Sequence, residues 1–298
     1  MSQAGTNSGF ATRRGASLPA SSRQPLRPIR KRYEELEIKL TELQRDYAEL
    51  HAAIFEAAQV HRRLCAPRLV RFGEIEIASE IFAVRHLPGD FFTVKEANQC
   101  AILALGDVCG KGLAAGMWTT HVVSLLSTRA AVSSQPELIV SGVNRDMCLM
   151  SSLVPLASLF VARLDPASGR LDYCSAGHPP ALLLRANGEL ETLSDGGLLL
   201  GVIPNAPYVR GSVELGAGDI LLAYSDGVLE TLNNSEEEFG LTRIESQLRR
   251  AALTHDVSIA RNKSAESVLF SVLAAVQDFA ASHLLVDDLS LVVIRRDD

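Results

Sequence analysis

The chain has 298 residues, of which 47% are hydrophobic and 21% are charged, and its formal net charge at pH 7 is −6. A chain of this length and apolar content can bury one large core or two smaller ones, so we expect most of it to fold. The sequence excludes a membrane-spanning protein, because no apolar run approaches the roughly 18 residues that a transmembrane helix needs. No signal-peptide pattern follows the basic residues Arg13 and Arg14.

Charge and cysteine usage indicate the class of ligand and the compartment. Residues 1–32 carry seven Lys or Arg and no acid, so the rest of the chain has a net charge of −13. This acidic body argues against nucleic acid as a ligand and is typical of a protein that collects divalent cations. The five cysteines are scattered and form no Cys-x-x-Cys pair. They predict reduced thiols in a cytoplasmic protein rather than a thiolate zinc site.

The N-terminal region predicts a tail followed by a long helix. Residues 1–29 are rich in Ser, Ala, Gly, Pro and Arg without hydrophobic periodicity, which predicts a disordered basic tail. A heptad pattern then predicts a coiled-coil helix over residues 30–66, roughly 50 Å long. Its a positions are Tyr33, Leu40, Tyr47, Ile54 and His61, and its d positions are Leu36, Leu43, Leu50, Ala57 and Leu64.

Leucine at most d positions over more than four heptads favours a left-handed, parallel homodimer through residues 33–64. His61, at an a position, is then interpreted as a polar residue that sets the register of the two helices. The alternative is a single helix that packs back on its own domain. Pro67 is expected to end the helix in either case.

Residues 67–298 alternate between short strands, turns and helices, which predicts a layered α/β domain. Strands are expected at 74–81, 91–94, 101–105, 158–164, 170–175, 181–185, 189–193, 220–224 and 289–294, and helices at 113–131, 137–150, 241–253 and 264–282. The first strand alternates as a half-buried strand does. Asn187-Gly188 is a strong hairpin signal, so the middle of this domain is expected to be antiparallel.

Four aspartates stand at the mouths of apolar strands, namely Asp90, Asp107, Asp226 and Asp287, with Asp288 beside the last. Asp107 is the central one, because a glycine loop and a helix follow it, which suits a metal or phosphate site. No His or Cys accompanies these carboxylates at ligand spacing, and an all-oxygen set is typical of Mg²⁺ or Mn²⁺. Two such ions can share a water, lower its pKa and hold both oxygens of a phosphoryl displacement. The alternative for any single Asp-Gly turn is a carboxylate that only caps the turn.

Five motifs in the chain carry a resemblance to a known family. They are Pro-Gly-Asp-Phe-Phe around Asp90, Gly106–Gly112, Ala176–Pro180, Tyr224–Gly227 and Asp287–Ser290. In this order they resemble the metal-dependent PPM protein serine/threonine phosphatases, in the SpoIIE-like branch that includes sigma-factor regulators of the RsbU type. The resemblance covers about residues 66–298. It implies an α-β-β-α sandwich of two antiparallel sheets flanked by helices, with two Mn²⁺ or Mg²⁺ ions at one edge.

The resemblance also implies roles for individual residues. Asp107 would bridge both ions, and the backbone carbonyl of Val108 would be a further ligand. Asp226 and Asp287 would hold one ion, and Asp90 would bind or orient at the same centre. A metal-bound hydroxide would then attack phosphoserine or phosphothreonine without a covalent enzyme intermediate, so catalysis would depend on Asp107 and Asp226. The usual substrate in this branch is a small phosphorylated anti-anti-sigma (STAS-type) protein.

Several residues are open to two interpretations. Thr93 stands where many relatives have a second aspartate. Lys111 is either a contact to the substrate phosphate or a solvated loop lysine. His178 either polarises a water or fixes its loop, and Glu230 either couples a helix to the metal site or lies on the surface. Asp288 is a further accessory candidate. The functional alternative is a non-catalytic module that keeps the fold and docks a partner, although all four strand-end aspartates are present.

Overall fold

The computed structural model describes residues 27–64, 68–85, 87–97, 99–150, 154–253 and 264–297. The chain divides into two compact units, Met1–Ala52 and Ala53–Asp298. The boundary lies inside the first helix, α1 (Arg27–Leu64), which begins three residues before its predicted start. The predicted tail otherwise lies outside the described residues. Within the described part, no helix combines the length and the apolar character that crossing a membrane requires.

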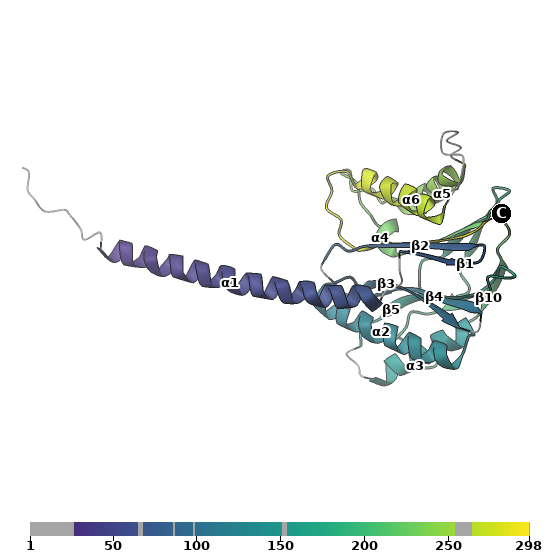
Figure 1. Ribbon diagram of the computed structural model, residues 1–298, viewed down its shortest axis with the longest axis horizontal. Coiled ribbons are helices and arrows are strands. Elements are labelled where there is room, and N and C mark those ends of the chain that lie inside the picture. Colours follow the sequence, from purple (N-terminus) through teal and green to yellow (C-terminus); the bar gives the residue numbers. More distant parts are fainter. Residues whose placement is uncertain are drawn as a thin grey trace, which may run out of the picture. The chain divides into compact units, whose positions relative to one another are not determined.

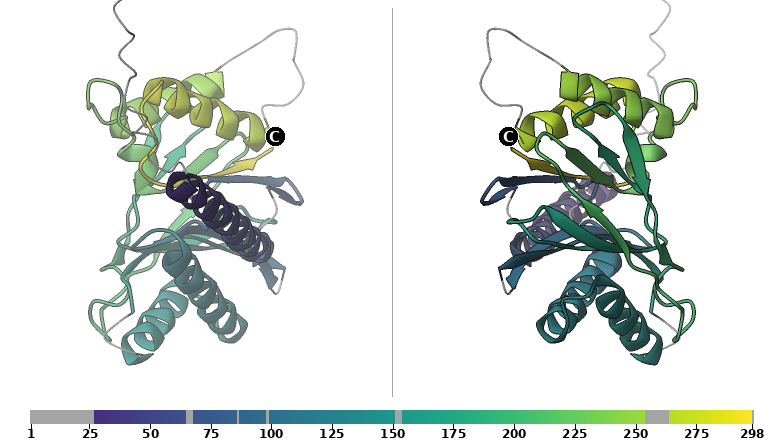
Figure 2. Two further views of the ribbon diagram at one scale, coloured as in Figure 1. Left: turned by 90° about the vertical axis from the view of Figure 1, so that its left-hand side faces the viewer. Right: turned by 90° about the vertical axis from the view of Figure 1, so that its right-hand side faces the viewer.

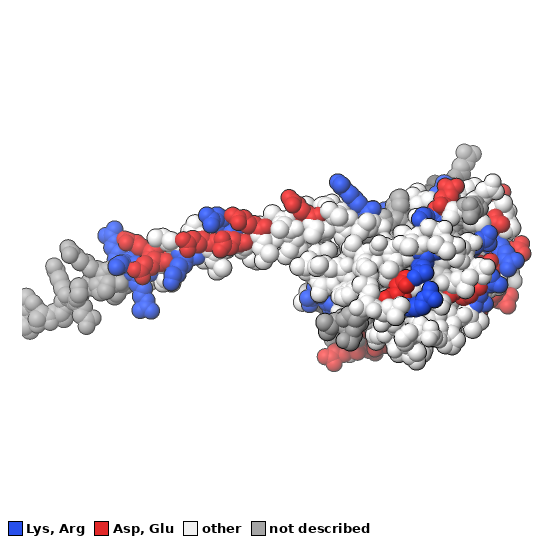
Figure 3. All heavy atoms as spheres, turned by 90° about the horizontal axis from the view of Figure 1, so that it is seen from below, with Lys and Arg blue, Asp and Glu red and all other residues white. Residues whose placement is uncertain are grey.

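The first unit contains the part of α1 that ends at Ala52. Opposite charges pair at i,i+4 spacing along it, at 3.2 Å for Arg30–Glu34 and 3.6 Å for Arg45–Glu49. Acidic and basic side chains are interspersed along this part of the helix (Figure 3). Such exposed pairs contribute at most about 0.5 kcal/mol each, so they do not by themselves explain a stable helix.

The a and d positions of this first part of α1 are exposed, with Leu43 at 66% and Leu40 at 55%. Because most helices gain their stability from packing an apolar face, an uncovered stripe of this kind is suited to a partner helix. The homodimer through residues 33–64 stays a prediction.

The last turns of α1 belong to the second unit and are packed there. Ala58 and His61 are buried, and burial lowers the pKa of His61. His61 therefore faces the body of its own chain, which is the arrangement of a helix packed back on its domain. The a and d positions from Tyr33 to Leu50 are exposed and so is Leu64, whereas Ile54 and Ala57 are half-buried.

The second unit contains two stacked sheets (Figure 1). The first has the order β1 (Leu69–Phe72), β2 (Ile75–Phe82), β12 (Leu289–Arg296), β11 (Ile220–Tyr224), β7 (Ala181–Leu184) and β8 (Leu190–Leu193). The second has the order β10 (Gly211–Glu214), β6 (Arg170–Ala176), β5 (Ala157–Leu164), β4 (Cys100–Val108) and β3 (Asp90–Ala97), with β9 (Gly196–Gly197) beside β6. Neighbouring strands are antiparallel apart from β9 and β6.

Helices cover the outer faces of both sheets (Figure 2). α2 (Leu113–Val132) and α3 (Pro136–Met150) pack on the second sheet, and α5 (Gly240–Leu253) and α6 (Ala265–Ala280) pack on the first. The short helix α4 (Asp226–Leu229) follows β11 directly. The predicted α-β-β-α sandwich is therefore confirmed.

Three apolar layers hold this sandwich together. Val268 and Val272 of α6 pack on the first sheet, and Val122 and Ile139 of α2 and α3 pack on the second. Between the sheets, β4 contributes Ala101, Leu103 and Leu105, while its Ile102 and Ala104 face the helices. Both faces of β4 are thus buried, which is why its sequence is a continuous apolar run.

The strand predictions were wrong in one respect and incomplete in others. The strand predicted at 74–81 as half-buried is β2, and its first five residues are all buried because both of its faces are covered. The short elements β1, β9, β10 and α4 were not predicted. The cysteines at 100, 109, 148 and 174 are free thiols, and Cys65 lies outside the described residues.

Candidate metal and active site

The strand-end aspartates come from both sheets. Asp90 on β3 is the direct register partner of Asp107 on β4. Asp226 follows β11, and Asp287 and Asp288 precede β12, the neighbour of β11 in the other sheet. A hydrogen bond of 3.0 Å from the Gly89 N–H to Asp288 Oδ2 joins the two groups. The four predicted carboxylates therefore gather where the two sheets meet.

The backbone of Gly89 lies against Asp107 and Val108. A Cβ at this position would lie 2.8 Å from Asp107 Oδ1 and 2.9 Å from the Val108 carbonyl oxygen, which is closer than a side-chain carbon can approach. The Gly89 carbonyl accepts hydrogen bonds from the Val108 N–H at 3.2 Å and the Thr119 hydroxyl at 2.9 Å. The loop before Asp90 is therefore held against Asp107 and Val108 by contacts that only glycine allows.

Asp288 holds a loop and does not point its oxygens at the other carboxylates. Its Oδ1 accepts the Val84 N–H at 2.8 Å, and its Oδ2 accepts the Gly89 N–H. Its carbonyl accepts the Ser225 hydroxyl at 3.3 Å. Of the paired aspartates before β12, Asp288 is therefore the residue that positions the segment leading to Asp90.

Lys111 places an ammonium group among the carboxylates. Its Nζ lies 2.7 Å from Asp287 Oδ2 and 2.8 Å from the Val286 carbonyl oxygen. The ammonium is thus bound within the cluster while its side chain stays 37% exposed, and its contact with a substrate phosphate stays a prediction. It marks Asp287 and its neighbouring carbonyl as a place that binds positive charge.

The electrostatics of the cluster show that one ammonium does not balance it. Burial, followed by the charges of Asp226 and Asp287, raises the pKa of Asp107 to about 7. Burial and the charge of Asp107 raise the pKa of Asp90 well above its usual range. The Oδ2 atom of Asp90 is buried and accepts no hydrogen bond from the described residues. Carboxylates in this condition are stabilised by a bound cation, which supplies the missing opposite charge.

The oxygen atoms of these carboxylates suit a hard divalent cation, although they do not lie close enough together to coordinate one as they stand. In the described residues, no three His, Cys, Asp or Glu side chains converge closely enough to hold an ion as they stand. Asp287 binds Lys111, and Asp226 Oδ1 accepts the Gly227 N–H at 2.9 Å. Carboxylates with a backbone carbonyl are the ligands that Mg²⁺ and Mn²⁺ prefer, and an ion bound here would compete with the Lys111 ammonium for Asp287.

The family can be assigned at this point. A model of the family "Stage II sporulation protein E (SpoIIE)" matches residues 97–297. The chain belongs to the SpoIIE family. The matched region of this SpoIIE-family chain includes Asp107, Asp226 and Asp287. Asp90 lies before the matched region.

Two curated relatives resemble this SpoIIE-family chain at low identity. Phosphoserine phosphatase RsbU of Bacillus subtilis is 24% identical over 249 residues, which are 83% of this chain and 71% of RsbU. Protein IcfG of Synechocystis sp. is 24% identical over 188 residues, which are 54% of this chain and 30% of IcfG. The chain thus spans less than a third of IcfG.

Solved structures show the same fold. The SiaA-PP2C domain of Pseudomonas aeruginosa has a TM-score of 0.71 at 19% identity, over 84% of this chain and 98% of that one. The PP2C phosphatase domain of SpoIIE from Bacillus subtilis has a TM-score of 0.61 at 18% identity, over 77% of this chain and 64% of that one. RsbX in complex with magnesium has a TM-score of 0.56 at 17% identity, over 76% of this chain and 97% of that one.

His178 of this SpoIIE-family chain fixes a loop behind the carboxylates. Its Nδ1 shares a hydrogen bond of 2.8 Å with the hydroxyl of Ser158, which is the register partner of Asp107. The side chain is buried, and burial lowers its pKa to about 3, so the imidazole is neutral at physiological pH. Its backbone N–H donates to Ser175 Oγ at 3.2 Å. These contacts favour the loop-fixing interpretation over polarisation of a water.

Glu230 lies on the surface at the end of α4. Its backbone N–H donates to the Asp226 carbonyl at 2.8 Å, while its side chain is exposed. Partial burial and the charge of Asp226 raise the pKa of its carboxyl group. The negative charge of the carboxylate cluster therefore acts on Glu230, although its own carboxyl group lies on the surface.

Sequence reasoning missed the residues that hold the aspartates in place. Gly89, Thr119, Ser158 and Ser225 act through backbone groups or through residues far away in the chain. Ser225 accepts the Ser290 N–H at 3.0 Å, and both serines lie inside motifs that the sequence singled out for their aspartates. Their presence in those motifs was the only available signal.

We expect this SpoIIE-family protein to lose stability as the pH rises when no metal is bound. The folded-state pKa of Asp107 is about 7 against 3.8 for the free carboxyl group, so between these values the folded state keeps a proton that the unfolded state has lost. The contribution of Asp107 to the free energy of unfolding is therefore greatest below about pH 4 and is lost as the pH rises through 7. Melting temperatures in EDTA should fall between pH 5 and pH 8, and Mn²⁺ should remove most of the fall. A melting temperature in EDTA that rises over this interval would contradict the expectation.

Proposed function

We propose that this chain is a metal-dependent protein phosphatase that hydrolyses phosphoserine or phosphothreonine. The observation that carries the proposal is the gathering of Asp90, Asp107, Asp226 and Asp287 from two sheets, with Lys111 as their cationic partner. Family membership and a relative named phosphoserine phosphatase support the reaction class. A fold neighbour in complex with magnesium supports a divalent cation.

The residues suggest how the chain would serve this reaction. Asp107, the Val108 carbonyl, Asp226 and Asp287 would hold two Mn²⁺ or Mg²⁺ ions, with Asp90 binding or orienting at the same centre. When bound, the ions lower the pKa of a water and offset charge on the phosphate. Asp288 and Gly89 keep Asp90 beside Asp107, and Lys111 supplies an ammonium that can bind a phosphate oxygen.

The substrate that we propose is a phosphorylated regulatory protein, in particular a STAS-type anti-anti-sigma factor. This rests on the resemblance to RsbU-type regulators and on a fold neighbour that contains RsbU and RsbW domains. Nucleic acid is not part of the proposal, because the body of the chain is acidic. A cytoplasmic location is part of it, on the basis of the scattered reduced cysteines.

The reaction class is tested with p-nitrophenyl phosphate in Mn²⁺, in Mg²⁺ and in EDTA. We expect release of p-nitrophenol that needs a divalent ion and is lost in Asp226→Ala, because that carboxylate is a proposed ligand. Turnover in EDTA equal to that in the presence of metal would contradict the proposal. The alternative, a non-catalytic scaffold, predicts no turnover and no heat on titration with Mn²⁺, and the four intact aspartates disfavour it.

We also propose that the exposed stripe of α1 forms a homodimer. Leu43→Asp places a charge at a d position and should convert the dimer into a monomer in sedimentation equilibrium. Thr41→Asp places the same charge on the outer face of the same turn and should leave the dimer intact. Equal masses for the wild type and Leu43→Asp would remove the dimer from the proposal.

A further inference from the structure

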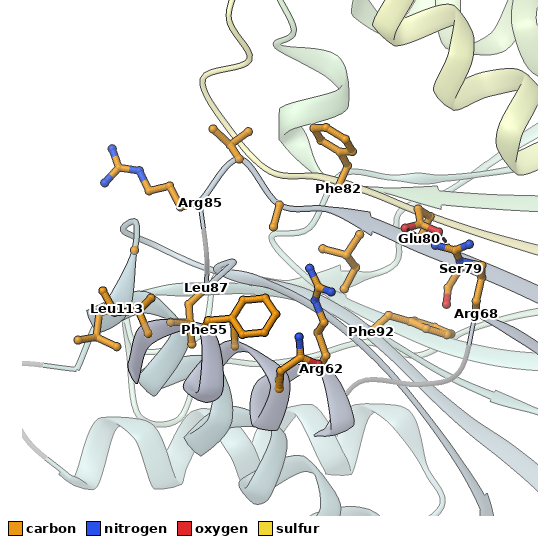
Figure 4. Close-up of a pocket in the computed structure, with 17 residues that line it drawn as sticks. Phe55, Arg62, Arg68, Ser79, Glu80, Phe82, Arg85, Leu87, Phe92 and Leu113 are labelled. Atoms are coloured by element: carbon orange, nitrogen blue, oxygen red, sulfur yellow. Dashed lines mark hydrogen bonds and ion pairs between the residues drawn. The ribbon is translucent and has the colours of Figure 1, made fainter. Parts of the chain in front are cut away.

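A cleft of about 900 Å³ opens in the second unit between the end of α1 and the edge of β2 (Figure 4). Phe55 and Arg62 line it from α1, and Glu80 and Phe82 line it from β2. Phe92 of β3 lies between these two walls. The cleft is distinct from the carboxylate cluster, since none of the strand-end aspartates lines it.

One wall of the cleft is the edge of β2, which has a strand neighbour among the described residues over only part of its length. β12 pairs with β2 along its whole length, as far as Phe82. On the other side, β1 pairs with β2 only through Ile75–Ala78, and the last contact is the Ser79 N–H donated to the Arg68 carbonyl at 2.8 Å. Beyond Ser79, no strand of the described residues pairs with this side of β2.

The backbone of Ile81 points to this uncovered side. The Ser225 N–H donates to the Ser290 carbonyl, and the Ser290 N–H donates to Ser225 Oγ, each at 3.0 Å, so the backbone of Ser290 faces β11. In an antiparallel ladder, successive residues face opposite neighbours, and directly opposed residues face either toward or away from each other. The register partner of Ser290 is Ile81. The N–H and C=O of Ile81 are therefore turned away from β12 and toward the cleft.

The side chains around the cleft select for negative charge and apolar groups. Arg62 and Arg85 have no ion-pair partner among the described residues, whereas Arg68 binds Glu80 at 2.6 Å. Arg62 extends from α1 toward β2 in Figure 4, beside the apolar Phe55. Arg85 points away from the other lining side chains in Figure 4, so with Arg68 bound to Glu80 the positive charge of Arg62 is the one that an acidic occupant would balance.

We propose that this cleft binds an extended acidic segment of a partner protein, which adds as a strand to β2 at Ile81. An open strand edge supplies backbone hydrogen bonds to such a segment, and neighbouring pockets select its side chains. Acidic side chains of the segment bind Arg62, and apolar ones cover Phe55, which is 59% exposed. The chain's own first 26 residues do not suit the cleft, because they carry three arginines and no acid.

The cleft lies next to the candidate active site, because some of its lining residues are bonded to the site or adjacent to it in the chain. Val84 and Arg85 line the cleft, and the Val84 N–H is bound to Asp288 Oδ1. Gly112 and Leu113, directly after Lys111, line it as well. A strand added at Ile81 therefore lies beside the segment that Asp288 holds, without touching a carboxylate of the cluster.

The proposal is tested by selecting from a phage-displayed library of random 12-residue peptides on the full chain. We expect enriched peptides in which Asp or Glu alternates with apolar residues. The synthetic peptide should bind Arg62→Glu at least about 10-fold more weakly in fluorescence anisotropy, which corresponds to about 1.4 kcal/mol. The matched control is Arg63→Glu, the next residue on the exposed end of α1, which does not line the cleft and should bind as the wild type does.

Strand addition has its own signature in hydrogen exchange. Exchange of the Ile81 amide, followed by NMR, should slow at least about 10-fold when the peptide saturates the protein, because its N–H gains a backbone partner. Methylating single backbone amides of the peptide should abolish binding only at every second position, because only alternate amides face β2. The proposal is overturned if no acidic peptide is enriched, if Arg62→Glu binds as tightly as the wild type, or if exchange of Ile81 is unchanged at saturation.

Discussion

Asp107→Asn is expected to lower metal-dependent turnover by at least about 10³-fold. The substitution keeps the size of the side chain but removes the charge that the proposed site needs to hold its ions, and with them the activated water. The carboxyl group is half-buried beside Asp90 and carries the charge repulsion of Asp226 and Asp287. Removing that charge should leave the metal-free protein folded and at least as stable, since an unfavourable carboxylate is lost.

The measurement combines initial rates in saturating Mn²⁺ with calorimetric titration of Mn²⁺ and a melting curve in EDTA. Asp278→Asn is the control, because Asp278 is an exposed aspartate on α6 and the same chemical change there should leave all three values as in the wild type. Retained turnover in Asp107→Asn would show that the reaction does not depend on this carboxylate. Lost turnover with a lower melting temperature in EDTA would instead point to damaged folding.

Gly89→Ala is expected to lower turnover by about 10²-fold, although it leaves every proposed ligand in place. The new methyl group would overlap Asp107 Oδ1 and the Val108 carbonyl oxygen, so the loop or the β4 end must move. A shift of this loop also breaks the hydrogen bond from Gly89 to Asp288 and displaces Asp90. Displacements of about 1 Å near a reacting centre commonly cost 10²-fold in rate.

The experiment compares turnover and Mn²⁺ affinity of Gly89→Ala with those of Gly216→Ala. A Cβ at Gly216 would meet only Asp219, at 3.5 Å or more, which is an ordinary contact, so this control should behave as the wild type does. Gly89→Ala with wild-type kinetics would mean that the loop can relax without moving Asp90.

Much of the fold and the identity of the aspartates could be predicted from the sequence. β4 and β11 are apolar runs that end in Gly-Asp or Ser-Asp-Gly, so periodicity and turn chemistry located both their strands and the adjacent carboxylates. The Asn187-Gly188 turn likewise located the β7–β8 hairpin. These features are local, and local patterns are what a single sequence displays.

The resemblance assigned Asp287 to the metal site and left Asp288 as an accessory candidate, but the sequence did not show what Asp288 binds. Asp287 binds Lys111, and Asp288 binds the amides of Val84 and Gly89, about 200 residues earlier in the chain. That difference depends on the packing of the first sheet against the loop before β3. The uncovered edge at Ile81 escaped prediction for a similar reason, since it follows from the short length of β1, which was not predicted.

The place of β12 in the first sheet has a consequence for synthesis of the protein. β12 follows all the other strands in chain order, yet it lies between β2 and β11. While the ribosome is still making the chain, β2 and β11 have no neighbour on the sides that β12 will occupy, and Asp287 has not been made. A chain that stops before Asp287 therefore lacks a carboxylate of the cluster as well as β12, and it exposes two hydrophobic strand edges that invite aggregation. The complete carboxylate cluster and the closed first sheet therefore both depend on the same last stretch of the chain, from Asp287 through β12.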